Sequence, residues 1–170
     1  IDSHTLFLPN WDERMKNQLN YLRNNGVSKP IISSYPHHLD FKQSTSIQDE
    51  KRNVTTLICD IKDSKSYPTI TMALEKPSGH FYRGYLLGAG YIFTYGEFFQ
   101  EITLDESLEH IFNGEEIMLA ILAYTHGWDI YSPAYMNLFH FYNHKKPHWL
   151  IDNSKDSWVQ ERDKGSYDRL

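Results

Sequence analysis

Hydrophobic residues change their spacing along the chain, and these changes predict alternating helices and strands. After residue 10, apolar side chains recur every three or four positions, which is typical of a helix with one buried face. The residues of this stripe are Trp11, Met15, Leu19 and Leu22. We expect Asn10 to cap this helix, with Glu13 completing a capping box, and Gly26 to stop it.

Short runs of apolar and β-branched residues predict strands. They lie at residues 30–35, 53–61, 69–75, 128–134 and 136–142. A short helix is expected at Glu97–Glu101, and a longer one over residues 114–126, stopped by Gly127. The expected core face of the longer helix consists of Ile117, Ala120, Ile121 and Tyr124. This alternation indicates an α/β domain, with a polar loop at 41–52 and a polar tail at 152–170.

Composition narrows the class of protein. The 170 residues are enough for one domain, and 40% apolar with 15% aromatic residues exclude a disordered chain. A net charge of −5 without a basic run argues against nucleic-acid binding. The single cysteine, Cys59, fits a reducing compartment, so a cytoplasmic location is expected. No apolar stretch reaches the roughly 18 residues of a membrane span. Because the sequence starts without Met, we expect a trimmed fragment of a longer protein.

Three separated segments carry candidate chemistry. Asp2 and His4 are two positions apart in an extended segment, so both side chains can point to one side. Oxygen and nitrogen ligands together suit a divalent metal such as Mn²⁺. Glu115 and Glu116 open the longer predicted helix, where the helix dipole alone also favours carboxylates. His140 lies on an aromatic-rich predicted strand, where a histidine is more often a core residue than a ligand.

The segment 84–91 places glycines among large apolar residues. Such a density of glycine indicates either close approach of the backbone to a ligand or tight packing between elements. The spacing alone leaves both interpretations open.

Taken in order, these segments resemble a known enzyme family. Asp-Ser-His comes first, followed by Ser-Ser-Tyr-Pro, the glycine-rich segment, Gly-Glu-Glu, Thr-His-Gly-Trp-Asp and the strand with His140. This order resembles the Skp1-hydroxyproline N-acetylglucosaminyltransferase-like glycosyltransferases. It is more distantly similar to the polypeptide N-acetylgalactosaminyltransferases, which have an Asp-x-His step, a Gly-Glu-Asn segment and a late histidine in the same order. The resemblance covers roughly residues 1–150.

The resemblance implies a fold and an activity. The fold would be the C-terminal part of a GT-A domain, a mixed sheet flanked by helices, over residues 1–150, followed by a tail at 151–170. The activity would be a retaining transfer of N-acetylglucosamine, or a related sugar, from a UDP-sugar to a hydroxyl group of a protein or peptide. Neither a nucleic acid nor a membrane is expected as a partner.

The resemblance also implies roles for individual residues. Asp2, His4 and His140 would bind Mn²⁺ or another divalent cation, which would neutralise the diphosphate. Glu115 and Glu116 would be the catalytic carboxylates beside the donor sugar. The wall around the donor sugar and the acceptor would consist of Gly88, Ala89, Gly90, Gly114, His126 and Trp128.

The sequence differs from the patterns that it resembles in two respects and leaves alternatives open. The strands that hold uracil and ribose in the family precede Asp-Ser-His and are absent from this sequence. The polypeptide-transferase relatives have an arginine shortly after the late histidine, and none shortly follows His140 here. A metal-dependent hydrolase with Glu115 as its base and a non-catalytic protein- or glycan-binding relative are the other candidate functions. Retention of configuration can proceed by front-face attack or through a covalent intermediate on Glu115.

Overall fold

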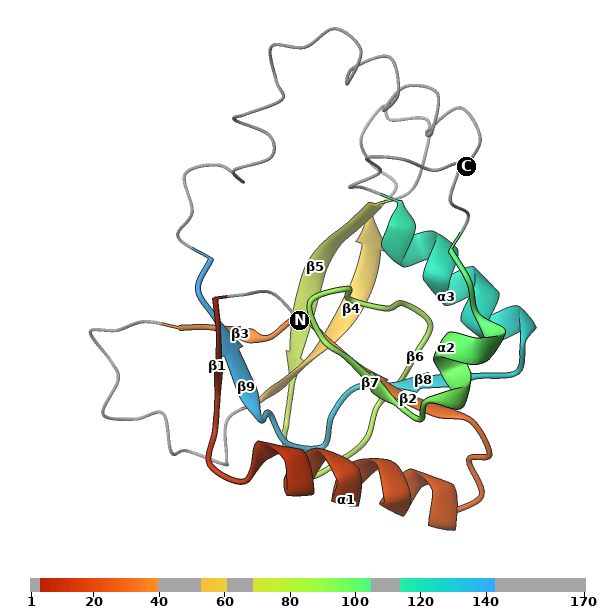
Figure 1. Ribbon diagram of the computed structural model, residues 1–170. Coiled ribbons are helices and arrows are strands. Elements are labelled where there is room, and N and C mark those ends of the chain that lie inside the picture. The colour runs from red at the N-terminus through yellow and green to blue at the C-terminus, as the bar shows by residue number, and fades with distance from the viewer. Residues whose placement is uncertain (1–3, 40–52, 61–68, 105–113, 143–170) are drawn as a thin grey trace, which may run out of the picture.

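The computed structural model describes residues 4–39, 53–60, 69–104 and 114–142. In this part of the chain, helices and strands form a mixed α/β arrangement with small sheets, as the sequence predicts (Figure 1). The helices are α1 (Trp11–Asn24), α2 (Glu97–Glu101) and α3 (Glu115–Thr125). The strands are β1 (Thr5–Phe7), β2 (Pro30–Ser33), β3 (His37–His38), β4 (Val54–Asp60), β5 (Thr69–Lys76), β6 (Arg83–Gly84), β7 (Ile92–Thr94), β8 (Asp129–Tyr131) and β9 (Leu138–His140).

The four-stranded sheet has the order β6-β8-β2-β7, with β2 between two neighbours. Ile31 of β2 lies opposite Ile130 of the parallel strand β8 and opposite Thr94 of the antiparallel strand β7. All four residues of β2 are buried. A strand covered on both faces needs no polar alternation, which accounts for its nearly continuous apolar sequence. The segment that follows Ser33 therefore begins in the interior of the protein.

A second sheet, with the order β1-β9-β3, brings distant parts of the chain together. His140 of the middle strand β9 lies opposite Thr5 of the antiparallel strand β1 and opposite His38 of the parallel strand β3. His4 immediately precedes β1, so the pairing carries it to the level of His140. Strands β4 and β5 form a separate antiparallel ladder with a register shift between Ile58 and Cys59.

The apolar stripe of α1 forms part of the main core, as predicted. Met15, Leu19 and Leu22 are buried and pack in one cluster with residues of β2 and β9. Gln18 is buried among them, which the apolar pattern did not indicate. Its Oε1 accepts hydrogen bonds from the backbone N–H groups of Ala134 (2.7 Å) and Tyr135 (3.2 Å), and its Nε2 donates to the Tyr135 carbonyl at 3.3 Å. One side chain thus ties α1 to the segment that leads into β9.

The two ends of α1 differ in how well the sequence predicts them. Asn10 has φ 58°, and its side chain makes no capping hydrogen bond, so the predicted Asn10 cap is wrong. The helix starts instead with a backbone bond from the Arg14 N–H to the Asn10 carbonyl at 3.0 Å. Gly26 has φ 92° just beyond the end of α1, as predicted, because a residue without Cβ adopts this left-handed conformation at little cost.

The predicted core face of α3 is wrong for two of its residues. Ile121 is 58% exposed and Tyr124 is 67% exposed, whereas Ala120 and Ala123 are buried. The buried alanines pack in a second core cluster with Trp128 and with residues of α2, β2 and β8. Small side chains let the helix lie close to these neighbours, so packing against them rather than side-chain size sets the rotation of α3.

The remaining expectations have mixed outcomes. The helix predicted at Glu97–Glu101 has the same bounds as α2, and the two late strands are present but shorter than predicted. The predicted loop at 41–52 and the predicted tail at 152–170 lie outside the described residues, so the domain boundary at residue 150 stays a prediction. Among the helices that the structure describes, none is long and apolar enough to cross a bilayer.

Candidate active site

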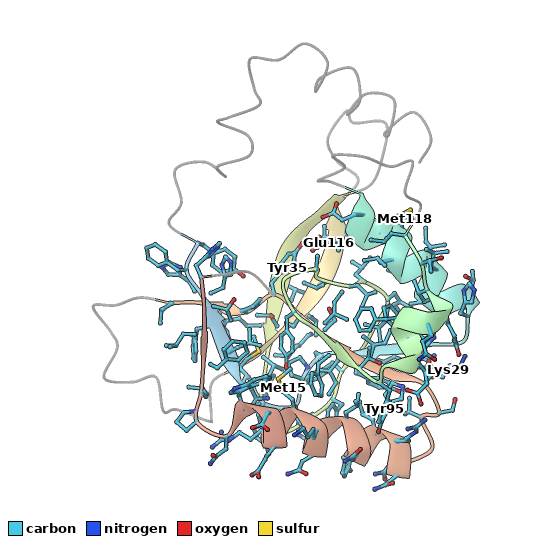
Figure 2. The ribbon with its side chains drawn as sticks, in the orientation of Figure 1. Met15, Lys29, Tyr35, Tyr95, Glu116 and Met118 are labelled. Atoms are coloured by element: carbon cyan, nitrogen blue, oxygen red, sulfur yellow. The ribbon has the colours of Figure 1, made fainter. Side chains whose placement is uncertain are left out.

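Glu116, in the first turn of α3, holds two other segments through its carboxylate. The Tyr35 hydroxyl donates a hydrogen bond to Oε2 of Glu116 at 2.6 Å, and the backbone N–H of Ala89 donates to Oε1 at 2.6 Å. Tyr35 follows β2, and Ala89 belongs to the glycine-rich segment. Figure 2 shows the Tyr35 and Glu116 side chains close together beside the start of α3. Both carboxylate oxygens of Glu116 are therefore engaged within the protein.

Gly88 lies against the chain that leaves β2. Its N–H donates to the Ser33 hydroxyl at 2.8 Å. A Cβ at this position would lie 2.9 Å from Cδ1 of Tyr35 and 3.0 Å from the Ser34 carbonyl oxygen. Real Cβ atoms do not come this close to other atoms, so Gly88 is required by tight packing between elements. One of the two interpretations of the glycine-rich segment is thus supported at this residue, and Gly90 follows in the same turn.

The segment after β2 is also held from its other side. The Ser34 hydroxyl donates to the Thr55 carbonyl at 2.8 Å and contacts the Thr55 hydroxyl, and that hydroxyl donates to the Tyr35 carbonyl at 2.6 Å. Strand β4 and helix α3 therefore fix Tyr35 through its backbone and its side chain respectively. Sequence reasoning quoted the Ser-Ser-Tyr-Pro segment but assigned Tyr35 no role. The signal in the sequence that could have indicated a role for Tyr35 is its position directly after a buried apolar run.

Glu115, the neighbour of Glu116, is in a different electrostatic position. It is half-buried, and its Oε2 is buried without a hydrogen-bond partner among the residues that the structure describes. Burial, aided by the negative charge of Glu116, raises the pKa of the Glu115 carboxyl to about 7. The Glu115 carboxyl therefore loses its proton near neutral pH rather than near its usual pKa of 4.5. Gly114 precedes it with φ 118°, a left-handed conformation that favours glycine at the start of α3.

His4 and His140 form a second group, next to the segment that follows Tyr35. Their ring centroids are 4.3 Å apart, and the ring of Tyr142 lies 4.2 Å from His140. The Tyr142 hydroxyl donates to the Pro36 carbonyl at 2.8 Å, and Pro36 directly follows Tyr35. The structure therefore brings together two of the three predicted metal ligands. Asp2 lies outside the described residues, and within those residues no three acidic, histidine or cysteine side chains form a metal-binding group.

Comparison with protein families identifies the chain. The model of the family described as Glycosyltransferase (GlcNAc) matches residues 1–170. The chain belongs to the Glycosyltransferase (GlcNAc) family. A comparison with curated proteins and a comparison with solved structures each gave no match. Membership of the Glycosyltransferase (GlcNAc) family supports a glycosyltransferase that acts on a sugar donor and an acceptor.

In this member of the Glycosyltransferase (GlcNAc) family, His126 and Trp128 do not lie with the two carboxylates. They follow the far end of α3, and eleven helical steps of 1.5 Å put about 16 Å between Glu115 and His126. Trp128 is buried, and its Nε1 donates to Oε2 of Glu101 at 3.0 Å. His126 is exposed at the end of α3, with its Nδ1 2.8 Å from the Leu122 carbonyl oxygen. The described structure thus unites Gly88, Ala89, Gly114, Glu115 and Glu116 but leaves these two residues apart.

Proposed function

We propose that the chain transfers N-acetylglucosamine from a UDP-sugar to a hydroxyl group of a protein or peptide, with retention of configuration. The observation that carries this proposal is the family match over the whole chain. The convergence of the glycine-rich segment with the start of α3 supports it, because these segments hold the residues expected beside the donor sugar. The assignment of these segments to a GT-A fold is part of the same proposal.

A divalent cation is proposed beside His4 and His140. Their imidazole rings are neighbours, because His4 directly precedes β1 and His140 lies on its partner strand β9, and imidazole nitrogen can serve as a metal ligand. Asp2 would add a carboxylate from a position two residues before His4. These residues fit the group, and a bound cation would neutralise negative charge on the diphosphate as it leaves the sugar.

We assign different roles to the two carboxyl groups. Glu116 is a positioning residue, because both of its oxygens bind groups of the protein. Glu115 has a buried oxygen without a described partner and a pKa of about 7, so its carboxyl group can donate a hydrogen bond or accept one. Glu115 is proposed to bind a hydroxyl group of the donor sugar and to orient its anomeric carbon.

The proposed reaction requires no protein nucleophile. The bond between the anomeric carbon and the diphosphate oxygen breaks, and its electron pair leaves with UDP. The acceptor oxygen forms a bond to the same face of the carbon, and its proton passes to the departing phosphate oxygen. If Glu115 instead attacked the carbon from the opposite face, a covalent glycosyl ester would form and then be displaced by the acceptor oxygen.

The proposal is tested by measuring donor binding and transfer separately. Calorimetry should show binding of UDP-N-acetylglucosamine that depends on Mn²⁺, and an acceptor peptide should stimulate release of UDP. Glu115→Gln should retain affinity for UDP but transfer sugar at least about tenfold more slowly. Glu97→Gln is the matched control, because Glu97 is also in the first turn of a helix but is exposed.

The outcomes separate the candidate functions. Equal transfer by Glu115→Gln would show that the acidity of Glu115 is not needed. Phosphate-ester cleavage without a sugar acceptor would favour the metal-dependent hydrolase instead. No metal-dependent donor binding at all would contradict the proposed transferase and leave a non-catalytic relative.

A further inference from the structure

A groove of about 640 Å³ opens along α1, away from the two candidate carboxylates. It lies between α1, residues 79–81 and the segment 134–137. Its volume is in the range of sites that hold small organic ligands. Asn137 of the groove directly precedes β9 and His140 ends this strand, so three extended residues put about 10 Å between the groove and His140. Among the described residues, none of those assigned to the donor sugar or the cation lines this groove.

We propose that this groove binds a saccharide independently of the sugar donor. The binding itself goes beyond the proposed function. The further step, that the bound saccharide belongs to the glycan of an acceptor, rests on the proposed function.

Aromatic side chains give the groove flat apolar surfaces. The rings of Tyr21 and Phe81 are nearly parallel, with an interplanar angle of 16° and centroids 5.6 Å apart. Tyr21 is 57% exposed and Tyr135 is 45% exposed, although both line the groove. The C–H face of a pyranose ring carries partial positive charge and packs on the negative face of an aromatic ring. Exposed tyrosines in a groove therefore suit a sugar ring better than a purely aliphatic ligand.

Polar groups of the groove suit the hydroxyl groups of a sugar. Asn17, Arg14 and His80 line it and offer amide, guanidinium and imidazole groups. Asn137 is fully buried at the base of the groove, where its Nδ2 donates to the Tyr135 carbonyl at 3.1 Å. Each sugar hydroxyl both donates and accepts, so it can pair with the donor and acceptor groups of these lining side chains. None of the described lining residues is acidic, which disfavours a cationic ligand.

The groove is held in shape by bonds that do not depend on a ligand. Gln18 fixes Ala134 and Tyr135 to α1 through its carboxamide. The N–H of Gly79 donates to the Ala134 carbonyl at 2.8 Å, which joins the two loops. Gly79 has φ 89°, and a Cβ built there would lie 3.5 Å from the Tyr135 hydroxyl oxygen. Because these loops are already held in place, less conformational entropy is lost when a ligand binds.

The test titrates the chain with chitotriose and with cellotriose in the presence of EDTA and without any UDP-sugar. We expect one or both to bind, with resonances of the α1 and 134–137 segments shifting in NMR spectra. Tyr21→Ala should weaken this binding at least tenfold, and Asn17→Ala should weaken it severalfold. Tyr124→Ala is the matched control, because Tyr124 is an exposed tyrosine on a different helix and should bind like the unmodified chain.

Each contrary outcome overturns the proposal. If neither saccharide binds, or if Tyr124→Ala weakens binding as much as Tyr21→Ala, the groove is not a saccharide site. The same conclusion follows if a sugar-free acceptor peptide alone binds there. Far-ultraviolet circular dichroism checks that each variant is folded. Because EDTA removes any cation and no donor is present, failure here is distinguishable from failure of metal-dependent donor binding.

Discussion

The Tyr35 hydroxyl donates to the Glu116 carboxylate across 81 positions of sequence, at a distance of 2.6 Å. The second oxygen of the same carboxylate accepts the N–H of Ala89. Burial and the negative charge of Glu116 both raise the pKa of the Tyr35 hydroxyl, so it stays protonated as the donor at all ordinary pH values. The Glu116 carboxylate therefore connects the start of α3 to the chain after β2 and to the glycine-rich segment.

Removal of the Tyr35 hydroxyl should destabilise the protein without changing its fold. Tyr35→Phe leaves a part-buried carboxylate oxygen without its donor, and hydrogen bonds to charged groups contribute about 1.5–3 kcal/mol. We expect the free energy of unfolding in urea to fall by roughly this amount. Tyr124→Phe, at an exposed position, should change it by less than about 0.5 kcal/mol. Equal effects of the two substitutions would contradict the assigned bond.

Gly88 should tolerate no side chain. In Gly88→Ala, the new Cβ would meet the Tyr35 ring at 2.9 Å and the Ser34 backbone at 3.0 Å, and Ser34 is fixed by β4. Overpacking of this kind costs about 1–3 kcal/mol, which urea unfolding can measure. Gly96→Ala is the matched control, since Gly96 has helical φ −58° and nothing within 4 Å of its added Cβ. A neutral Gly88→Ala would show that the segment can move away from β2.

Stability should depend on pH through Glu115. The pKa of its carboxyl is raised in the folded protein from 4.5 to about 7, so the folded state binds more protons between these values. The free energy of unfolding should therefore decrease as pH rises from about 4.5 to about 7 through this group, and then stay level. In Glu115→Gln this decrease should be smaller, as measured by urea midpoints at several pH values. Glu97→Gln should keep the dependence of the unmodified chain.

The histidine pair should control binding of a cation. Asp2→Ala, His4→Ala and His140→Ala are each expected to weaken Mn²⁺-dependent binding of UDP at least about tenfold, because each removes a proposed ligand. Calorimetry with and without Mn²⁺ measures this change, and thermal unfolding checks the fold of His140→Ala, since His140 is buried. Glu97→Gln serves as control. Unchanged affinity in all three variants would remove the metal assignment.

Local patterns in the sequence predicted two of the helices, although they gave the wrong cap at Asn10. The stripe of α1 and the bounds of α2 follow from residues within one or two helical turns, and the structure confirms both. The core face of α3 required knowledge of its neighbours. Ile121 and Tyr124 are the larger side chains, yet Ala120 and Ala123 face the core because α2 and β8 lie close to the helix. Side-chain size within one helix does not reveal which face its neighbours approach.

The candidate site was predictable only in part for the same reason. Glu115, Glu116 and Gly88 were singled out, but their spacing could not show that Glu116 and Ala89 are bonded. Tyr35 received no role, because its contact with Glu116 depends on how β2 meets α3. Gln18 was equally hidden, since a polar residue in an apolar stripe has no predictable partner until the loop around Ala134 is in place.

Gln18 has a consequence for how the protein can change. Its carboxamide both accepts from two backbone N–H groups and donates to a carbonyl. Glutamate has the same length and shape, but an ionised carboxylate has no hydrogen to offer and would face the Tyr135 carbonyl oxygen with a negative charge. Gln18→Glu, which replaces the amide nitrogen with an oxygen, would therefore weaken the connection between α1 and the segment that leads into β9. At this position the chemical identity of the side chain, rather than its size, therefore determines whether α1 stays bound to the segment 134–137.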